Sequence, residues 1–468
     1  MSAVARMEGP VKSSVRSGPL HAANAAALAL ARATVHQGVG GTRGFVVAPV
    51  RHLPARGPQA GGPHILIARD LTPADTAALD LSEIAAFCTS AGGPTSHAVQ
   101  VAYSLGIPTV VAAGNEVLSI TEGQMCALDG DTGTLYAGLT GGDLDAATAY
   151  RDRARAQARR PAAAGSTPVT LTGTVMGASQ VAEMRAAGAQ GIGLLATELL
   201  FLGREQHLAD EEQHYQAYRA IAHAVGEAPV TLRTLDIGGD KEMPSLGLPR
   251  EDNPFLGVRG LRLSLRRPDL FLPQLRAAYR AARDDGARLR LMFPMVTGVE
   301  EFTRAAQMAR EVQAELGAPP LPLGVMVEVP ACALAVDRFV EHVDFLSIGT
   351  NDLAQYLTAT SRTNPALARD TDPLHIAVTR TVQAVTAAAA AGGVAVSACG
   401  GLAGDPVGAV VLASLGVTAL TVAVPYLPEV HAVLCRADAS SLATIRDQAL
   451  ETGGSRHLRS VVTSLLGL

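Results

Sequence analysis

Eight short runs of β-branched and aliphatic residues recur between residues 169 and 424, each followed by a stretch typical of a helix. The runs are "VTLTGTVM", "GIGLLAT", "VTLRTLDI", "LRLMFPMV", "LGVMVEVP", "VDFLSIGTND", "VAVSACG" and "VTALTVAV". Strands that alternate with helices favour a parallel sheet, and eight such units in under about 300 residues are what a closed (β/α)8 barrel requires. A doubly wound open sheet is the alternative, but no GxGxxG follows a first strand. We therefore expect an α/β chain that contains a TIM-type barrel.

Polar and charged residues cluster at the carboxyl ends of these expected strands. They are Arg233 and Asp236 on the third, Glu328 on the fifth, Asn351 and Asp352 on the sixth, and Cys399 on the seventh. Barrel active sites are built on this face. Any one of these residues could instead cap a helix or join an ion pair. Because several strand ends carry such residues together, the sequence predicts an active site at the barrel mouth.

A second feature is "AGGPTSHAVQVAYSLGIPTVV", residues 91–111. Glycines and a proline form a turn, Thr95 or Ser96 is a good N-cap, and apolar residues then recur at helical spacing until Gly106, which is expected to end the helix. His97 therefore lies in the first turn of a helix, where free N–H groups and the helix dipole stabilise an anionic group such as phosphate. A histidine that only caps or packs is the alternative interpretation.

Composition limits the remaining possibilities. A formal net charge of -5 without a long basic run argues against nucleic acid as a partner. No apolar segment is long enough to predict a membrane span. The five cysteines have neither CxxC nor metal-ligand spacing, so we expect reduced thiols in a cytoplasmic protein.

The expected domain organisation has five parts. Residues 1–40 carry little pattern, and short strands in 41–140 predict a compact α/β domain around His97. A charged linker helix is expected in 141–167, the barrel in 168–445 and a helical tail in 446–468.

The segment "GGPTSHAVQVAYSLGIPTVV" resembles the phosphohistidine signature of phosphoenolpyruvate (PEP)-utilising enzymes. In the barrel, the segments that resemble Enzyme I, the PEP-protein phosphotransferase family of the bacterial sugar phosphotransferase system, occur in the same order as in that family: "RTLDIGGDKEMP", "NPFLGVRGLRLSL", "LMFPMVTGVEEF", "GVMVEVPA", "VDFLSIGTNDLAQYLTATSR" and "CGGLAGDP". The resemblance implies a swivelling phosphohistidine β/β/α domain followed by a PEP-binding barrel. It also implies a cytoplasmic homodimer that phosphorylates itself from PEP, releases pyruvate and passes the phosphoryl group to a histidine-containing phosphocarrier protein or another acceptor.

The resemblance also implies a role for each site residue. His97 would be phosphorylated, and Glu328 and Asp352 would hold Mg²⁺, a hard cation suited to carboxylates and phosphate oxygens. The phosphoryl group would be bound by Arg233, Arg362 and Asn351, with Arg259 close to the same substrate, because guanidinium groups match such oxygens bidentately. Cys399 would protonate enolpyruvate as a general acid. A small buried hydrophobe is the alternative for this cysteine.

Three departures from the family are visible. Ala196 stands where an arginine is expected to bind the phosphoryl group, and Tyr103 replaces an arginine on the helix of His97. Only "RHLPARGPQAGGPH" joins "GFVVAPV" to "HILIA", where the family inserts a helical module that docks the phosphocarrier protein. Two alternatives therefore stay open: an impaired relic or PEP-binding regulator, and an enzyme with a small-molecule acceptor.

Overall fold

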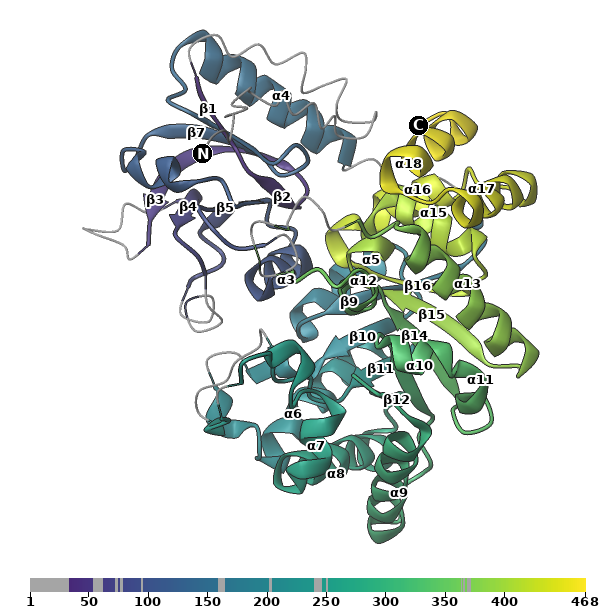
Figure 1. The fold of residues 1–468 in the computed structure, drawn as a ribbon. Helices are drawn as coiled ribbons and strands as arrows, with labels where there is room; N and C mark the ends of the chain where they lie inside the picture. Colours follow the sequence, from purple (N-terminus) through teal and green to yellow (C-terminus); the bar gives the residue numbers. More distant parts are fainter. Residues whose placement is uncertain are drawn as a thin grey trace, which may run out of the picture.

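The computed structural model describes residues 33–53, 62–71, 75, 79–93, 96–158, 165–201, 204–239, 246–249, 251–362, 364, 367 and 372–468. These residues form a sheet domain and a barrel domain, and the sheet domain lies against one end of the barrel (Figure 1). Of residues 1–40, which were expected to carry little pattern, residues 1–32 lie outside the described residues.

The sheet domain is built on an eight-stranded sheet with the strand order β1-β8-β7-β3-β4-β5-β6-β2. Its strands are β1 Thr34–Gln37, β2 Val39–Thr42, β3 Phe45–His52, β4 His64–Ala68, β5 Ile84–Thr89, β6 Thr109–Val111, β7 Met125–Asp129 and β8 Thr134–Ala137. Alternating side chains of β3 and β4, among them Val50, Ile65 and Ile67, fill its core. Strands β1 and β2 begin ahead of the boundary expected at residue 41.

Helix α3, His97–Leu105, connects β5 to β6 and has the expected ends. Ser96 occupies the N-cap position, although its side chain makes no capping hydrogen bond. Gly106 ends the helix in the left-handed conformation, with φ 66°. Ala98, Val101 and Ala102 are buried at the predicted helical spacing. A short 3-10 helix, η1 Asn115–Ser119, follows β6, and α4, Gly142–Ala158, leaves the sheet domain after β8.

The barrel is closed and parallel, as predicted: β16 pairs with β9, and each other strand pairs with the next along the chain. Its strands are β9 Thr170–Val175, β10 Ile192–Ala196, β11 Val230–Arg233, β12 Leu289–Phe293, β13 Leu323–Val327, β14 Phe345–Gly349, β15 Ala395–Cys399 and β16 Ala419–Ala423. All eight coincide with the apolar runs, because parallel strands buried on both faces need hydrophobic side chains on both.

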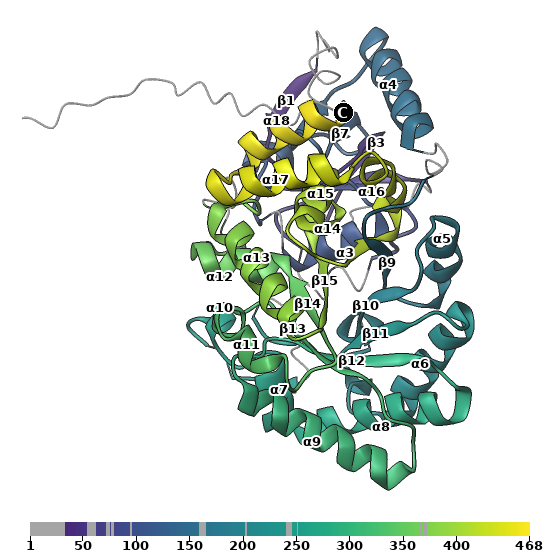
Figure 2. The same cartoon turned by 90° about the vertical axis from the view of Figure 1, so that its right-hand side faces the viewer.

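Helices surround the barrel (Figures 1 and 2). In its first half they are η2 Ala178–Gln180, α5 Val181–Ala186, η3 Thr197–Phe201, η4 Glu205–His207, α6 Glu211–Val225, η6 Pro254–Leu256, α7 Leu261–Arg266, α8 Pro268–Asp285 and α9 Val299–Leu316. In the second half they are α10 Pro330–Leu334, α11 Val336–Phe339, α12 Thr350–Thr358, α13 Ile376–Ala391, α14 Gly401–Gly404, α15 Pro406–Ser414, η8 Val424–Tyr426 and α16 Leu427–Leu434. Most of them pack on the strands through one large apolar core, and a smaller cluster that includes Phe201 of η3 and Leu263 of α7 lies beside it.

The final two helices, α17 Ala439–Glu451 and α18 Ser455–Leu466, pack on α15 (Figure 2). Leu458 and Val462 of α18 are fully buried, and Arg459 pairs with Asp405 at the start of α15. The C-terminal helices are therefore part of the barrel domain.

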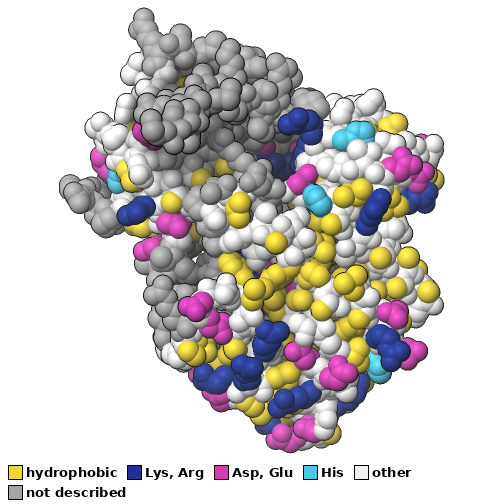
Figure 3. Space-filling view, in the orientation of Figure 1, with side chains coloured by type: hydrophobic (Ala, Val, Ile, Leu, Met, Phe, Trp, Pro, Cys, Tyr) yellow, Lys and Arg dark blue, Asp and Glu magenta, His cyan; other side chains and the backbone are white. Residues whose placement is uncertain are grey.

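Two further observations concern possible contacts with other molecules or with a membrane. Hydrophobic side chains spread over the barrel on the face seen in Figure 3, and Leu334 at the end of α10 is 84 % exposed. In the described part of the chain, no helix combines the length and the apolar character needed to cross a membrane.

Candidate active site

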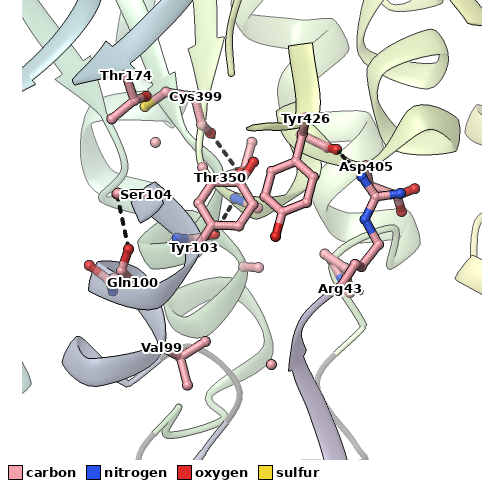
Figure 4. A pocket seen from close by; sticks show the side chains of 18 of the residues that line it. Arg43, Val99, Gln100, Tyr103, Ser104, Thr174, Thr350, Cys399, Asp405 and Tyr426 are labelled. Atoms are coloured by element: carbon pink, nitrogen blue, oxygen red, sulfur yellow. Dashed lines mark hydrogen bonds between the residues drawn. The ribbon is translucent and has the colours of Figure 1, made fainter. Parts of the chain in front are cut away.

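The sheet domain and the barrel mouth enclose a cavity of about 540 Å³ between them. The sheet domain contributes β2 and the helix α3, whose residues Val99, Gln100, Tyr103 and Ser104 face the cavity (Figure 4). The barrel contributes residues at or just after the carboxyl ends of its strands, namely Ala196, Arg233, Glu328, Asn351, Asp352 and Cys399, and also Arg362, which follows α12. The structure thus brings the polar strand ends predicted from the sequence together at one site.

Two arginines and two carboxylates form a buried charge network beside the cavity, and of these four residues only Asp352 and Arg362 line it. The Arg259 guanidinium donates to both carboxyl oxygens of Asp236, at 3.0 and 3.1 Å, and to both oxygens of Asp352, at 2.8 and 3.1 Å. Arg362 also donates to Asp352 Oδ2, at 3.1 Å. Burial by itself would raise the pKa of Asp352, but the charges of Arg259 and Arg362 outweigh it and hold this pKa well below its usual range. Asp352 is therefore an anion in the folded protein.

Glu328 has the opposite electrostatic environment. Its carboxyl accepts one hydrogen bond from the Met295 N–H, at 2.8 Å, where Met295 adopts φ 58°. Burial, followed by the negative charges of Asp352 and Asp236, raises the pKa of Glu328 to about 8. Glu328 follows β13 and Asp352 follows β14, and these two strands are paired neighbours. The two carboxyl groups therefore share one side of the cavity with a surplus of negative charge beside Glu328.

This surplus fits a divalent cation that is also coordinated by substrate oxygens. Among the described residues, no group of three His, Cys, Asp or Glu side chains could hold a metal alone. A hard cation such as Mg²⁺ is commonly held by one or two carboxylates plus phosphate oxygens, so the pair Glu328 and Asp352 suits it. Room exists beside Glu328 because residue 349 is glycine: a Cβ there would lie 2.7 Å from Glu328 Oε2.

The first part of the barrel also supplies a buried ion pair. Arg233, the last residue of β11, donates to Glu198 Oε1 at 2.5 Å and lies 3.5 Å from Asp236. Glu198 is 1 % exposed and follows β10 in η3. Glu198 was not among the predicted site residues, although its place two residues after β10 is the same signal that indicates Glu328 and Asp352.

Cys399 ends β15 inside the barrel mouth. It packs against Met292, Met326 and Phe345, and its carbonyl oxygen accepts a hydrogen bond from the Thr350 hydroxyl at 2.7 Å. Burial raises the pKa of the Cys399 thiol to about 12, against the opposing effect of Arg233. The thiol therefore keeps its proton at neutral pH. The Asn351 side chain accepts from the Gly401 N–H at 3.0 Å, which fixes its amide at the cavity.

The comparisons with known proteins agree with this architecture. Residues 154–439 match the family model described as "PEP-utilising enzyme, PEP-binding domain", and residues 61–133 match "PEP-utilising enzyme, mobile domain". The first match covers more than half of the chain. The chain belongs to the PEP-utilising enzyme family.

Three relatives illustrate the relationship. The chain is 38% identical over 408 residues to a "Phosphoenolpyruvate-protein phosphotransferase" of Haloferax volcanii, covering 85% of this chain and 72% of that protein. It is 40% identical over 404 residues to a protein of the same name from Streptomyces coelicolor, covering 84% and 71%. It is 46% identical over 407 residues to a "Multiphosphoryl transfer protein" of Xanthomonas campestris pv. campestris, covering 85% and 48%. The chain spans about half the length of the multiphosphoryl transfer proteins that it matches.

Two further positions matter in this member of the PEP-utilising enzyme family. Ala196 ends β10, lines the cavity and pairs in register with Arg233 of β11. The helix α3 begins at His97, of which the structure describes only the backbone. Because other residues of α3 line the cavity, the helix that carries His97 lies at the barrel mouth.

Proposed function

We propose that this chain transfers the phosphoryl group of PEP to His97 and then to an acceptor, releasing pyruvate. The observation that carries this proposal is that one cavity, beside the helix that begins at His97, is lined by two arginines, two coupled carboxyl groups and a protonated thiol, while Arg259 binds one of these carboxylates from outside the cavity lining. The names of the relatives support the same reaction.

In the proposed first step, an imidazole nitrogen of His97 attacks the phosphorus of PEP, and the bond from phosphorus to the enol oxygen breaks. Arg233 and Arg362 bind the phosphoryl oxygens with the Asn351 amide, and Arg259 holds Asp352 in place beside them. Mg²⁺ held by Glu328 and Asp352 would neutralise phosphoryl charge. Phosphoryl transfer depends mainly on positioning and charge stabilisation, which these groups can provide.

The second step converts the departing enolate of pyruvate into pyruvate. Cys399 donates its proton to the methylene carbon of the enolate, and the thiolate is later reprotonated by solvent. The raised pKa suits this role, because a thiol that ionised at neutral pH would have no proton to give. The apolar contacts with Met292 and Met326 hold the thiol at the barrel mouth.

A second candidate function is a PEP-binding regulator that does not transfer phosphate. Ala196 favours it, since the family resemblance places a phosphoryl-binding arginine there. The retained Glu328, Asp352 and Cys399 favour the enzyme.

We also propose a cytoplasmic homodimer. Cys88, Cys126, Cys332, Cys399 and Cys435 are all free thiols, as expected in a reducing compartment. The apolar barrel face of Figure 3 is a suitable contact surface between copies.

The intact mass of the protein tests the proposed transfer. After incubation with PEP and Mg²⁺, wild type should gain one phosphoryl group that is lost in acid, and His97→Ala should gain none. PEP binding to wild type without any mass increase would refute the transfer and support the regulator. Equal labelling of wild type and His97→Ala would show that another residue is phosphorylated.

A further inference from the structure

Three side chains lie where the sheet domain meets the barrel, and the proposed chemistry uses none of them. The rings of Tyr103, on α3, and Tyr426, on η8 after the last barrel strand, are stacked with centroids 4.8 Å apart and planes at 23° (Figure 4). The guanidinium of Arg43, which follows β2, lies 4.9 Å from the centroid of Tyr426. We call Arg43, Tyr103 and Tyr426 the interdomain latch.

Polar contacts reinforce the latch from other parts of the barrel. Arg43 pairs with Glu429 of α16 at 3.0 Å and donates to the Gly404 carbonyl of α14 at 2.9 Å. Burial would lower the pKa of Arg43, but Glu429 and Asp405 outweigh it, so the arginine stays charged. Separately, Gln180 donates to the carbonyl of Ser104 on α3 at 3.1 Å. Several barrel segments therefore hold one face of the sheet domain.

The surfaces of the two domains fit closely around the Tyr103 ring. A Cβ on Gly404 would lie 1.6 Å from the Tyr103 hydroxyl oxygen and 2.8 Å from its ring, and its three nearest atoms all belong to Tyr103. Gly404 is helical and does not adopt a positive φ, so its own backbone does not require glycine. The missing side chain at this position admits the tyrosine of the other domain.

The latch also fixes the position of the proposed nucleophile. Tyr103 follows His97 by six residues on the same helix, a distance of about 9 Å along its axis. Docking of Tyr103 therefore determines where the start of α3 lies over the barrel mouth. Phosphoryl transfer is sensitive to this placement, since a displacement of about 1 Å can cost on the order of 100-fold in rate.

We propose that Tyr103, Tyr426 and Arg43 hold the sheet domain on the barrel, and that the two tyrosines are positioning residues for phosphoryl transfer to His97. This inference rests on the proposed function. Where the family resemblance expects an arginine at position 103, this chain uses an aromatic contact to the barrel. The residues proposed to bind PEP all belong to the barrel, so we expect PEP affinity to depend little on the latch.

The test uses a Gly404→Ala variant, whose methyl group strikes Tyr103, and the full-length chain. Single-turnover phosphorylation of His97 at saturating PEP should slow about 100-fold, while PEP affinity measured by calorimetry changes less than about two-fold. Tyr103→Ala should also slow transfer. Adding Gly404→Ala to Tyr103→Ala should cost nothing more, because the methyl then has no ring to strike. Tyr103→Phe keeps the stacked ring and should retain near wild-type transfer.

The matched control is Gly142→Ala in the sheet domain, where a Cβ meets no atom within 4 Å. It should transfer phosphate at the wild-type rate. Small-angle X-ray scattering without PEP gives a second readout: Gly404→Ala should have a larger radius of gyration than wild type and Gly142→Ala. If wild type is not phosphorylated, the proposed function is wrong. The scattering result still tests whether the latch holds the sheet domain on the barrel. If Gly404→Ala had the same radius of gyration and the same phosphoryl-transfer rate as wild type, the proposed role of the latch would be wrong.

Discussion

Replacing Ala196 by arginine tests how this chain binds the phosphoryl group. Ala196 is 4 % exposed at the end of β10 and lies directly beside Arg233, on a neighbouring strand about 4.8 Å away. An arginine here extends into the cavity that Ala196 lines. The variant therefore places a second guanidinium next to Arg233, at the position where the family resemblance expects one.

The expected magnitude follows from two opposing effects. A guanidinium that contacts a transferring phosphoryl group contributes on the order of 10³-fold in rate. This corresponds to about 4 kcal/mol of transition-state stabilisation. Repulsion between two cations about 5 Å apart is about 3 kcal/mol at an effective dielectric constant near 20. Glu198 and Asp236 already flank Arg233 and offset part of this repulsion. The variant should therefore fold and transfer faster.

The assay is single-turnover phosphorylation of His97 by rapid quench, with calorimetry for PEP binding. Ala196→Arg should accelerate transfer about 100-fold or more and change PEP affinity less than about ten-fold, since Arg233 and Arg362 already bind the ground state. Ala196→Met is the matched control, because it fills the same space without charge and should give no acceleration. A fast wild type that Ala196→Arg does not improve would refute the reasoning and show that another group already supplies the missing charge.

Other predictions follow from burial, charge and the connection between β3 and β4. Burial lowers the pKa of His214 to about 4, below its ordinary 6.5, so proton binding favours the unfolded chain as the pH falls. Through this group, the free energy of unfolding of wild type should decrease by about 2–3 kcal/mol between pH 7 and 4.5. Urea unfolding at the two pH values should show a smaller decrease for His214→Gln. Glu328→Gln should abolish Mg²⁺-dependent PEP binding in calorimetry while the circular dichroism spectrum is retained; unchanged metal dependence would contradict the assignment. Phe302→Ala should lower the free energy of unfolding by about 3–5 kcal/mol, because this ring is 1 % exposed in the barrel core. A standard histidine-containing phosphocarrier protein should bind weakly in solution, because only residues 53–63 join β3 to β4, where the family resemblance expects a helical docking module. A specific interface needs above about 1,000 Å² of buried surface, which so short a connection cannot supply. A submicromolar dissociation constant would disprove this.

The barrel and its mouth could be predicted from the sequence because both depend on local patterns. Parallel strands buried on two faces appear as uninterrupted apolar runs, and the residue that follows such a run lies at the catalytic face. Glu328 and Cys399 were identified in this way. Strand β1 could not be identified, because it is short and three of its four side chains are exposed.

The contact between the domains could not be predicted for a different reason. In the sequence, all eight barrel strands lie between Tyr103 and Tyr426. No periodicity of the sequence links the two positions, although their rings are stacked in the structure. From the sequence, Tyr103 only indicated a lost positive charge. Its packing partner became apparent once the fold brought η8 to α3, because long-range side-chain complementarity leaves no local signature.

The burial of Cys399 has a consequence for the chemical reactivity of this protein. Alkylating agents and peroxides react with thiolates, and a thiol whose pKa is about 12 holds almost no thiolate at neutral pH. Although Cys399 lines the cavity, its protonated thiol should therefore react slowly with both classes of reagent. The burial that keeps the proton on the thiol also makes Cys399 a poor target for cysteine-directed drugs.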